Sequence, residues 1–121
     1  MADAVAIQRP TEYAIVHELL GNARGTVADI GCGPGVFTRF LAARSKRVWS
    51  VDIDYASLLR VKARHRKLGN VGFVVANAYS LPFHDSVLSA ALLLETLEHL
   101  QDDSVAVREL CRVVAPRGKL V

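Results

Sequence analysis

The chain has 121 residues, enough for one folded domain around a single hydrophobic core. Apolar residues make up 51% and charged residues 22% of it, which excludes a disordered chain. The longest nearly unbroken apolar stretch, 87–94, is too short to span a membrane, and the chain does not open like an exported protein. Cys32 and Cys111 show neither metal-ligand spacing nor a disulfide framework. We therefore expect a cytoplasmic protein without a metal site.

The net charge of +3 is unevenly distributed along the chain. Residues 39–67 contain nine lysines and arginines against two aspartates, so this stretch carries +7 and the remainder −4. Such a basic stretch is typical either of a nucleic-acid or anionic-lipid footprint or of the solvated face of two surface helices. We favour the second interpretation, because it is the commoner one, and expect no nucleic-acid or membrane partner.

The first predicted element is a helix over residues 10–22. Pro10 and Thr11 suit a helix start, and Gly21 and Asn22 suit its end. The spacing of four apolar side chains indicates one buried stripe on this helix: Tyr13, Val16, Leu19 and Leu20.

Beyond residue 22, predicted strands and helices alternate. The predicted strands are 27–30, 47–51 (ending at Asp52), 71–76, 87–94 and a strand that begins at 119; the predicted helices are 36–44, 55–68 and 102–114, with a turn at 115–118. This alternation predicts an α/β fold with a doubly wound parallel sheet. Ligands of such sheets bind beyond the carboxyl ends of the strands.

One segment connects the first predicted strand to the next helix through alternating glycines, Asp29-Ile30-Gly31-Cys32-Gly33-Pro34-Gly35. Glycines allow close approach of the backbone, and we expect the free N–H groups that open the helix to face a ligand. A dinucleotide-binding loop has a third glycine where this chain has Val36. Asp29 would repel a pyrophosphate and attract a cation, which disfavours an NAD(P)-dependent oxidoreductase.

Residues 29–35 resemble motif I of the class I S-adenosylmethionine-dependent methyltransferases. The resemblance implies a Rossmann-like sheet of order 3-2-1-4-5 with helices on both faces, S-adenosylmethionine as cofactor and S-adenosylhomocysteine as product. Family members usually continue through two more strands, so the resemblance implies truncation after the fifth strand. We expect a single domain over 1–121, with an N-terminal helical segment (1–24) and a Rossmann-like core (25–121).

The resemblance and the spacing together assign cofactor binding to residues at three successive strand ends: Asp29, Gly31, Cys32, Gly33, Gly35, Asp52, Ile53, Asn77 and Ala78. Asp52 follows Gly31 by twenty-one residues, where an acid that accepts from a ribose is expected. Asp54 directly precedes a predicted helix and is better interpreted as its N-cap.

Asn77 and Ala78 follow the third predicted strand, where family members usually carry an acid and a small residue that contact adenine. Asn77 can accept through its amide oxygen, although a turn-forming asparagine is an equally open interpretation on spacing alone. The segment 81–83, Leu-Pro-Phe, resembles one found in small-molecule methyltransferases; Ser89 stands where they carry an aspartate.

Glu95 and His99 leave the carboxyl end of the fourth predicted strand, where the transferred methyl group would emerge. Either side chain is a candidate general base. The alternative interpretation, in which these residues merely open a helix, also fits.

The sequence therefore predicts an enzyme, a methyltransferase that acts on a small-molecule acceptor. The alternative is a non-catalytic or truncated S-adenosylmethionine-binding module that works as a partner subunit. A nucleic-acid methyltransferase rests only on the basic stretch, since no Asn-Pro-Pro-aromatic tetrapeptide follows the fourth strand. We also expect the edge strand at 119–121 to pair in a homodimer or with a partner chain, because its backbone groups lack a neighbour.

Overall fold

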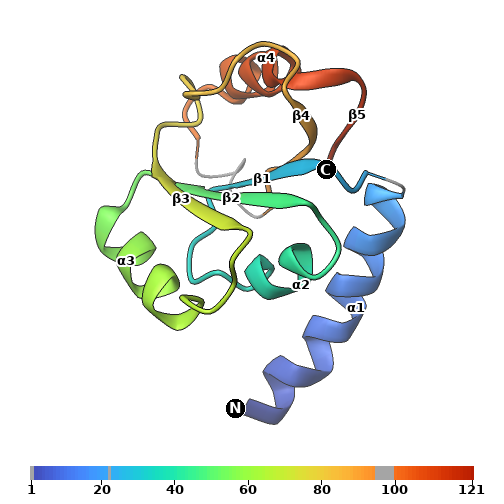
Figure 1. Cartoon of the computed structure of the whole chain (residues 1–121), viewed down its shortest axis with the longest axis vertical. Helices are drawn as coiled ribbons and strands as arrows, with labels where there is room; N and C mark the ends of the chain where they lie inside the picture. Colours follow the sequence, from blue (N-terminus) through green and yellow to red (C-terminus); the bar gives the residue numbers. More distant parts are fainter. Residues whose placement is uncertain (1, 22, 95–99) are drawn as a thin grey trace.

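The computed structural model describes residues 2–21, 23–94 and 100–121. It contains a five-stranded sheet in the order β3-β2-β1-β4-β5, with every neighbouring pair parallel (Figure 1). The strands are β1 (Thr26–Ile30), β2 (Arg47–Asp52), β3 (Val71–Val75), β4 (Leu88–Leu92) and β5 (Val114–Leu120). The predicted α/β class and strand order are confirmed.

Helices cover both faces of this sheet, as predicted. They are α1 (Ala2–Leu20), α2 (Thr38–Ala42), α3 (Tyr55–Arg64) and α4 (Asp103–Val113). In Figure 1, α4 lies above the sheet, and α1, α2 and α3 lie below it. The buried residues form two clusters, one of which includes Ala106, Leu110 and Val113 of α4, and the other Val16 and Leu20 of α1 with Leu41 of α2. Each cluster buries one side of β1 and β4, which explains why these central strands are mostly apolar.

The predicted start of the first helix is wrong. Helix α1 begins at Ala2 and continues through Pro10. A proline inside a helix removes only one backbone hydrogen bond, and the alanines before it favour a helix strongly. The predicted stripe is partly confirmed: Val16 and Leu20 are buried, but Leu19 is 52% exposed.

The helix after the glycine turn is also shorter than predicted. Residues 33–37 form turns, and α2 begins at Thr38 and ends at Ala42. The glycine turn, in which Gly33 and Gly35 have φ values of +53° and +77°, extends to Phe37, so the helix begins two residues later than predicted. Helix α3 ends at Arg64 instead of residue 68, because His65 leaves the helical conformation while its Nδ1 donates to the carbonyl oxygen of Val61 at 3.0 Å.

The predicted turn at 115–118 is part of a strand. Leu88 pairs with Val114 and Ala90 with Lys119, so residues 115–118 form a bulge opposite Ser89 alone. A proline and a glycine are compatible with a strand at an edge or a bulge, and β5 is the edge strand of the described sheet. A Cβ atom on Gly118 would lie 2.8 Å from the carbonyl oxygen of Ser89, so the strand approaches β4 closely here.

The register of the sheet places the ends of three strands next to one another. Ile30 pairs with Val51, and Asp52 pairs with Val75. The residues that follow β1, β2 and β3 therefore share one edge of the sheet. None of the helices in the described ranges has both the length and the apolar character needed to cross a membrane.

Candidate functional site

The loop after β1 is tied to β2 by its own backbone. The N–H groups of Gly31 and Cys32 both donate to the carbonyl oxygen of Val51, at 2.8 and 2.9 Å. The N–H of Gly33 donates to Oδ2 of Asp52 at 2.9 Å, and that of Gly35 donates to the carbonyl oxygen of Cys32 at 3.0 Å. Protein oxygens thus accept the bonds of these four N–H groups, and ligand contact by the N–H groups that open the helix stays a prediction.

Two glycines of the loop are required for different reasons. Both Gly33 and Gly35 have positive φ, which strains any other residue. A Cβ atom on Gly35 would lie 2.7 Å from Cγ1 of Val61, so only a glycine lets α3 pack against the loop. A Cβ atom on Gly33 would meet nothing within 4 Å. Gly33 therefore faces open space, where a ligand can approach the backbone.

Two carboxyl groups lie at the edge that the loop crosses. Asp29, on β1, is only 3% exposed. Its burial, and then the nearby charge of Asp52, raise the pKa of Asp29 from 3.8 to about 7. A positively charged group placed here would oppose both effects. The end of β1 thus carries a buried carboxyl group whose negative charge is disfavoured.

Asp52 ends β2 and accepts hydrogen bonds from the backbone of the glycine loop and of the segment that follows β2. Besides accepting from Gly33, it accepts from the N–H of Asp54 through Oδ1 at 2.9 Å. Each carboxylate oxygen has a second lone pair, so Asp52 can still accept from ligand hydroxyls. The neighbouring Ile53 is 68% exposed, and its side chain is available to cover a ligand.

The predicted N-cap of α3 is confirmed. Asp54 accepts from the N–H of Ala56 at 3.1 Å and from the hydroxyl of Ser57 at 2.8 Å. These bonds, that to the Ser57 hydroxyl above all, lower the pKa of Asp54. Asp54 therefore stabilises the start of the helix, as an N-cap residue does.

Cys32 is not a nucleophile in this arrangement. Its side chain is buried, and burial together with the charges of Asp29 and Asp52 raises the pKa of the thiol to about 12. A thiol that stays protonated packs as a small apolar group. Cys32 thus contributes its shape and its backbone to the loop.

Asn77 and Ala78 lie just beyond β3, at the same edge. Oδ1 of Asn77 accepts from the N–H of Tyr79 at 2.9 Å, and its carbonyl oxygen accepts from that of Ser80 at 3.0 Å. The turn-forming interpretation of Asn77 is therefore present in the structure. Ala78 is buried and packs in the core beneath the turn. Contact of either residue with adenine stays a prediction.

The two predicted base residues, Glu95 and His99, lie outside the described residues. Within the described ranges, no three His, Cys, Asp or Glu side chains gather as the ligands of a metal ion would.

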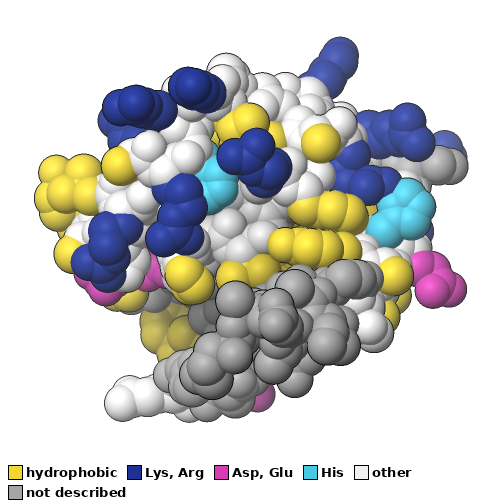
Figure 2. All heavy atoms as spheres, turned by 90° about the horizontal axis from the view of Figure 1, so that it is seen from below, with side chains coloured by type: hydrophobic (Ala, Val, Ile, Leu, Met, Phe, Trp, Pro, Cys, Tyr) yellow, Lys and Arg dark blue, Asp and Glu magenta, His cyan; other side chains and the backbone are white. Residues whose placement is uncertain are grey.

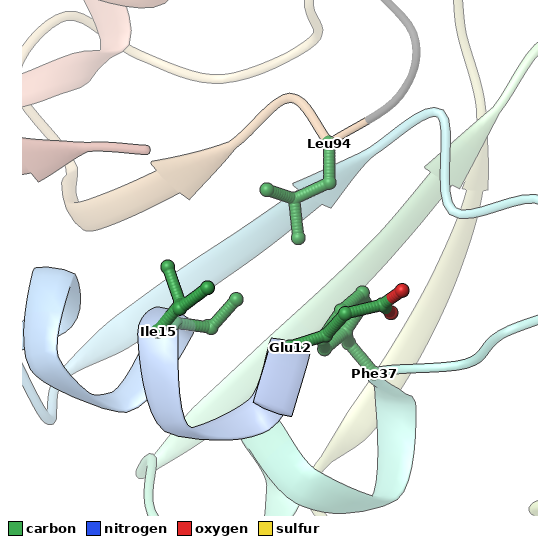
Figure 3. A pocket seen from close by; sticks show the side chains of 5 residues that line it. Glu12, Ile15, Phe37 and Leu94 are labelled. Carbon is green, nitrogen blue, oxygen red and sulfur yellow. The ribbon is translucent and has the colours of Figure 1, made fainter. Parts of the chain in front are cut away.

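The sequence did not predict a shallow hollow of about 170 Å³ between α1 and the end of β4. Glu12, Ile15 and Val16 of α1, Phe37 after the glycine loop and Leu94 beyond β4 line it (Figure 3). The only signal in the sequence is the apolar spacing along α1, which predicted core packing. That spacing could not show that Ile15 stays 52% exposed at the rim of a hollow.

The basic stretch 39–67 lies over α2 and α3, and lysine and arginine side chains spread across this side of the molecule (Figure 2). Several of its arginines make contacts inside the protein. Arg44 stacks on the ring of Phe40 and contacts His17, Arg47 stacks on Trp49, and Arg64 donates to the carbonyl oxygen of Pro34. A structural role thus accounts for part of this charge.

Comparison with known proteins agrees with this geometry. A family described as "Methyltransferase domain" matches residues 28–121, most of the chain. The chain belongs to this methyltransferase domain family. The match begins inside β1 and includes the glycine loop, the ends of β2 and β3, and all of α4 and β5.

Individual relatives of this methyltransferase domain are longer. O-methyltransferase rstn1 of Aspergillus nomiae is 30% identical over 96% of the chain and 53% of its own length. The demethylmenaquinone methyltransferase of Corynebacterium kroppenstedtii is 34% identical over 78% of the chain and 39% of its length. A crystal structure of the [4+2]-cyclase SpnF superimposes with a TM-score of 0.82 at 27% identity, over 91% of this chain and 42% of that one. The chain spans about half or less of these proteins.

Proposed function

We propose that this methyltransferase domain binds S-adenosylmethionine at the edge formed by the glycine loop, Asp29 and Asp52, and transfers its methyl group to a small-molecule acceptor. One observation carries the proposal: the N–H groups of Gly31, Cys32, Gly33 and Gly35 are bonded to protein oxygens, while the carboxyl groups of Asp29 and Asp52 lie at neighbouring strand ends. A pyrophosphate needs free N–H donors, whereas a sulfonium and an ammonium need carboxylates. The site thus suits S-adenosylmethionine better than a dinucleotide.

The residues present fit this cofactor. Gly33 leaves open space beside the loop, where a side chain would otherwise stand. Asp52 retains acceptor capacity for ribose hydroxyls, and Asp29 lies where a positive charge is favoured. Asn77 and Ala78 follow β3, the strand next to β2, and we assign contact with adenine to them. We assign these residues, with Gly31, Cys32, Gly35 and Ile53, to the cofactor site.

When bound, S-adenosylmethionine supplies a methyl group activated by a positively charged sulfur. The residues of this chain bind and orient, which can supply most of the rate of an in-line displacement. A cation beside Asp29 lowers the pKa of that carboxyl group and so keeps it ionised. Glu95 and His99 are our proposed residues for accepting a proton from the acceptor, and a transfer to an already ionised acceptor needs neither.

The proposed partner is a small-molecule acceptor, in a protein located in the cytoplasm, with no nucleic acid involved. The name of one relative, a demethylmenaquinone methyltransferase, supports the small-molecule acceptor. Pairing of copies along β5 is a further proposal. Pro116 offers no N–H there, and Arg117 and Lys119 are exposed charges that oppose edge pairing. Light scattering at high concentration tests it, with a dimer as the supporting result.

Calorimetry with S-adenosylmethionine, S-adenosylhomocysteine and NAD tests the proposed function. We expect heat with the first two ligands and none with NAD. Asp52→Asn should weaken binding of S-adenosylhomocysteine by roughly 1.5–3 kcal/mol, because a hydrogen bond to a charged group is worth about that much.

Asp54→Asn is the matched control, since asparagine is as good an N-cap as aspartate and should bind like the parent chain. If Asp54→Asn weakens binding and Asp52→Asn does not, the ribose assignment is wrong. Heat with NAD alone would contradict the proposed function itself.

A further inference from the structure

A basic hollow of about 350 Å³ lies between α2 and the turn that follows α3. Four exposed cationic side chains line it: Arg39 from α2, and Arg64, Arg66 and Lys67 from the end of α3 and the residues beyond it. No acidic side chain of the described residues lines it. Figure 2 shows lysine and arginine side chains across this side of the molecule. The basic hollow therefore brings four positive charges to one concave surface.

The two aspartates of the basic stretch lie at the opposite end of α3. Asp54 caps the start of this helix, and Asp52 accepts from the glycine loop. A helix of 10 residues is about 15 Å long, and charges farther apart than about 8 Å are largely screened at physiological salt. The C-terminus of α3 supplies only about half a negative charge. Within the described ranges, none of the four cations forms an ion pair with an acid.

Hydrogen bonds hold both walls of the basic hollow in place. Nη1 of Arg64 donates to the carbonyl oxygen of Pro34 at 3.1 Å, which uses only one of the N–H donors of the guanidinium. Nδ2 of Asn70 donates to the carbonyl oxygens of Ala42 and Ser45, at 2.8 and 3.0 Å. These two bonds tie the segment after α3 to the end of α2. The basic hollow is thus preformed, as small-molecule sites usually are.

His65 adds a hydrogen-bonding group to the same hollow. It lines the hollow although it is only 7% exposed. Its Nδ1 donates to the carbonyl oxygen of Val61, and none of the described residues bonds to its Nε2. This nitrogen can accept from a protonated phosphate oxygen or, once the ring is protonated, donate to an ionised one. The basic hollow therefore offers a ligand one polar ring nitrogen besides the four cations.

Charge and size identify the class of ligand. A volume of about 350 Å³ is within the range of small-molecule sites. Guanidinium groups match phosphate oxygens, because the two can form parallel, charge-assisted hydrogen bonds. A terminal diphosphate or triphosphate carries several negative charges, whereas a carboxylate carries only one and would leave most of the cations uncompensated.

A nucleic acid suits this surface less well. Its backbone needs cations that continue along a track. Outside the basic hollow, Arg44 and Arg47 stack on aromatic rings, and Arg60 donates to the hydroxyl of Ser57. The cations without such contacts are therefore concentrated in one hollow.

We propose that the basic hollow binds a small molecule with a terminal diphosphate or triphosphate group. Arg39 contacts the phosphates from α2, and Arg64, Arg66 and Lys67 contact them from the end of α3. The site is separate from the cofactor edge, and none of these four side chains belongs to the proposed cofactor site. The proposal therefore goes beyond the proposed function and does not depend on it.

Calorimetry of the 121-residue chain with inorganic tripolyphosphate, at about 0.15 M salt, tests the proposal. We expect one site per chain with a Kd below about 1 mM. Orthophosphate should bind at least about tenfold more weakly, because it carries less charge, and NAD, which has no terminal phosphate, should give no heat. Arg39→Gln and Arg66→Gln should each weaken tripolyphosphate at least about fivefold, since each removes charge-assisted hydrogen bonds.

Lys62→Gln is the matched control, because Lys62 is an exposed cation in the last turn of α3 that does not line the basic hollow. It should change the affinity for tripolyphosphate less than about twofold, since salt screens its charge. Binding of S-adenosylhomocysteine should persist in all three variants and shows that they are folded. Its failure in the parent chain would contradict the proposed function and leave this proposal standing.

Three results overturn the proposal. The first is no heat with tripolyphosphate, which would leave the basic stretch a solvated face. The second is equal weakening by Lys62→Gln and Arg39→Gln, which would show a diffuse effect of charge. The third is tighter binding of single-stranded RNA or of phosphatidylserine vesicles than of tripolyphosphate, with a steep dependence on salt, which would make this side a surface for a polymer or a membrane.

Discussion

Two regions of the molecule hold acidic side chains against a loop, and they shift the pKa of these side chains in opposite directions. At the glycine loop, burial and the neighbouring Asp52 raise the pKa of Asp29 to about 7. At α4, hydrogen bonds from Arg112 lower the pKa of Glu109, which is only slightly exposed. The first region thus disfavours its own negative charge, and the second stabilises it.

Arg112 explains the second region. Its guanidinium donates to both carboxylate oxygens of Glu109 at 2.7 and 2.9 Å and to Asp85 at 2.7 Å. It also donates to the carbonyl oxygens of Leu81 and Phe83, at 3.0 and 2.9 Å. Glu109 in turn accepts from the N–H of Leu81 at 2.6 Å. One side chain thereby fastens the loop 81–85 to α4.

The comparison shows where stability and function are located in this domain. The loop near α4 has its charges paired within the protein, as expected for a structural contact. The glycine loop has its N–H groups paired and a carboxyl group left in an unfavourable environment, as is common at binding sites. The three substitutions below test this difference, from the largest expected effect to the smallest.

The variant Gly35→Ala disturbs the packing contact between the glycine loop and α3. We expect it to lower the free energy of unfolding by about 2–5 kcal/mol, because backbone strain adds about 1–2 and overpacking against Val61 about 1–3. Urea unfolding measures this. Gly33→Ala is the control, since it shares the strain and lacks the contact, and should cost only about 1–2 kcal/mol. Equal losses in the two variants would contradict the packing role of Gly35.

Arg112→Gln breaks the second region. It removes the guanidinium donor of two carbonyl oxygens and of the Glu109 carboxylate, which keeps only the N–H of Leu81, so we expect the melting temperature to fall by roughly 5 °C or more. Arg108→Gln, one turn earlier on the exposed side of α4, should change it by less than about 1 °C. Binding of S-adenosylhomocysteine should persist in both variants. A similar fall for Arg108→Gln would show that charge alone, and not this set of bonds, stabilises α4.

The variant Asp29→Asn tests the first region through the pH dependence of its thermal stability. Because the folded-state pKa of Asp29 is about 7 and its ordinary value is 3.8, folding is penalised progressively as the pH rises from about 4 to about 7. The asparagine variant should therefore melt roughly 3 °C above the parent chain at pH 8, with a smaller gap at pH 4.5. Thermal melts followed by circular dichroism measure this. A gap that is the same at both pH values would show that Asp29 does not titrate in this range.

Much of the fold follows from local features of the sequence. Apolar runs specified the central strands, the alternation with helices specified a parallel sheet, and Asp54 before a helical pattern specified an N-cap that the structure contains. The predicted ends of the helices and strands were less accurate. Pro10 favoured a helix start and residues 115–118 a turn, yet α1 continues through the first and β5 includes the second as a bulge. At both positions, the hydrogen bonds of a long helix or of a sheet edge outweigh the local preference of the residues.

The candidate functional site shows the same division between features that are local in the sequence and features that depend on the tertiary structure. The glycine spacing and the strand-end carboxylates are readable from the sequence, because glycine conformations and strand periods are local properties. The tertiary structure decided what these groups do: Gly33 donates to Asp52, nineteen residues away, and Arg112 donates to Leu81, thirty-one residues away. It also decided that Glu12 and Leu94, from opposite ends of the chain, border one hollow. Such pairings depend on how parallel strands and helices cross over, and no periodicity along the chain records them.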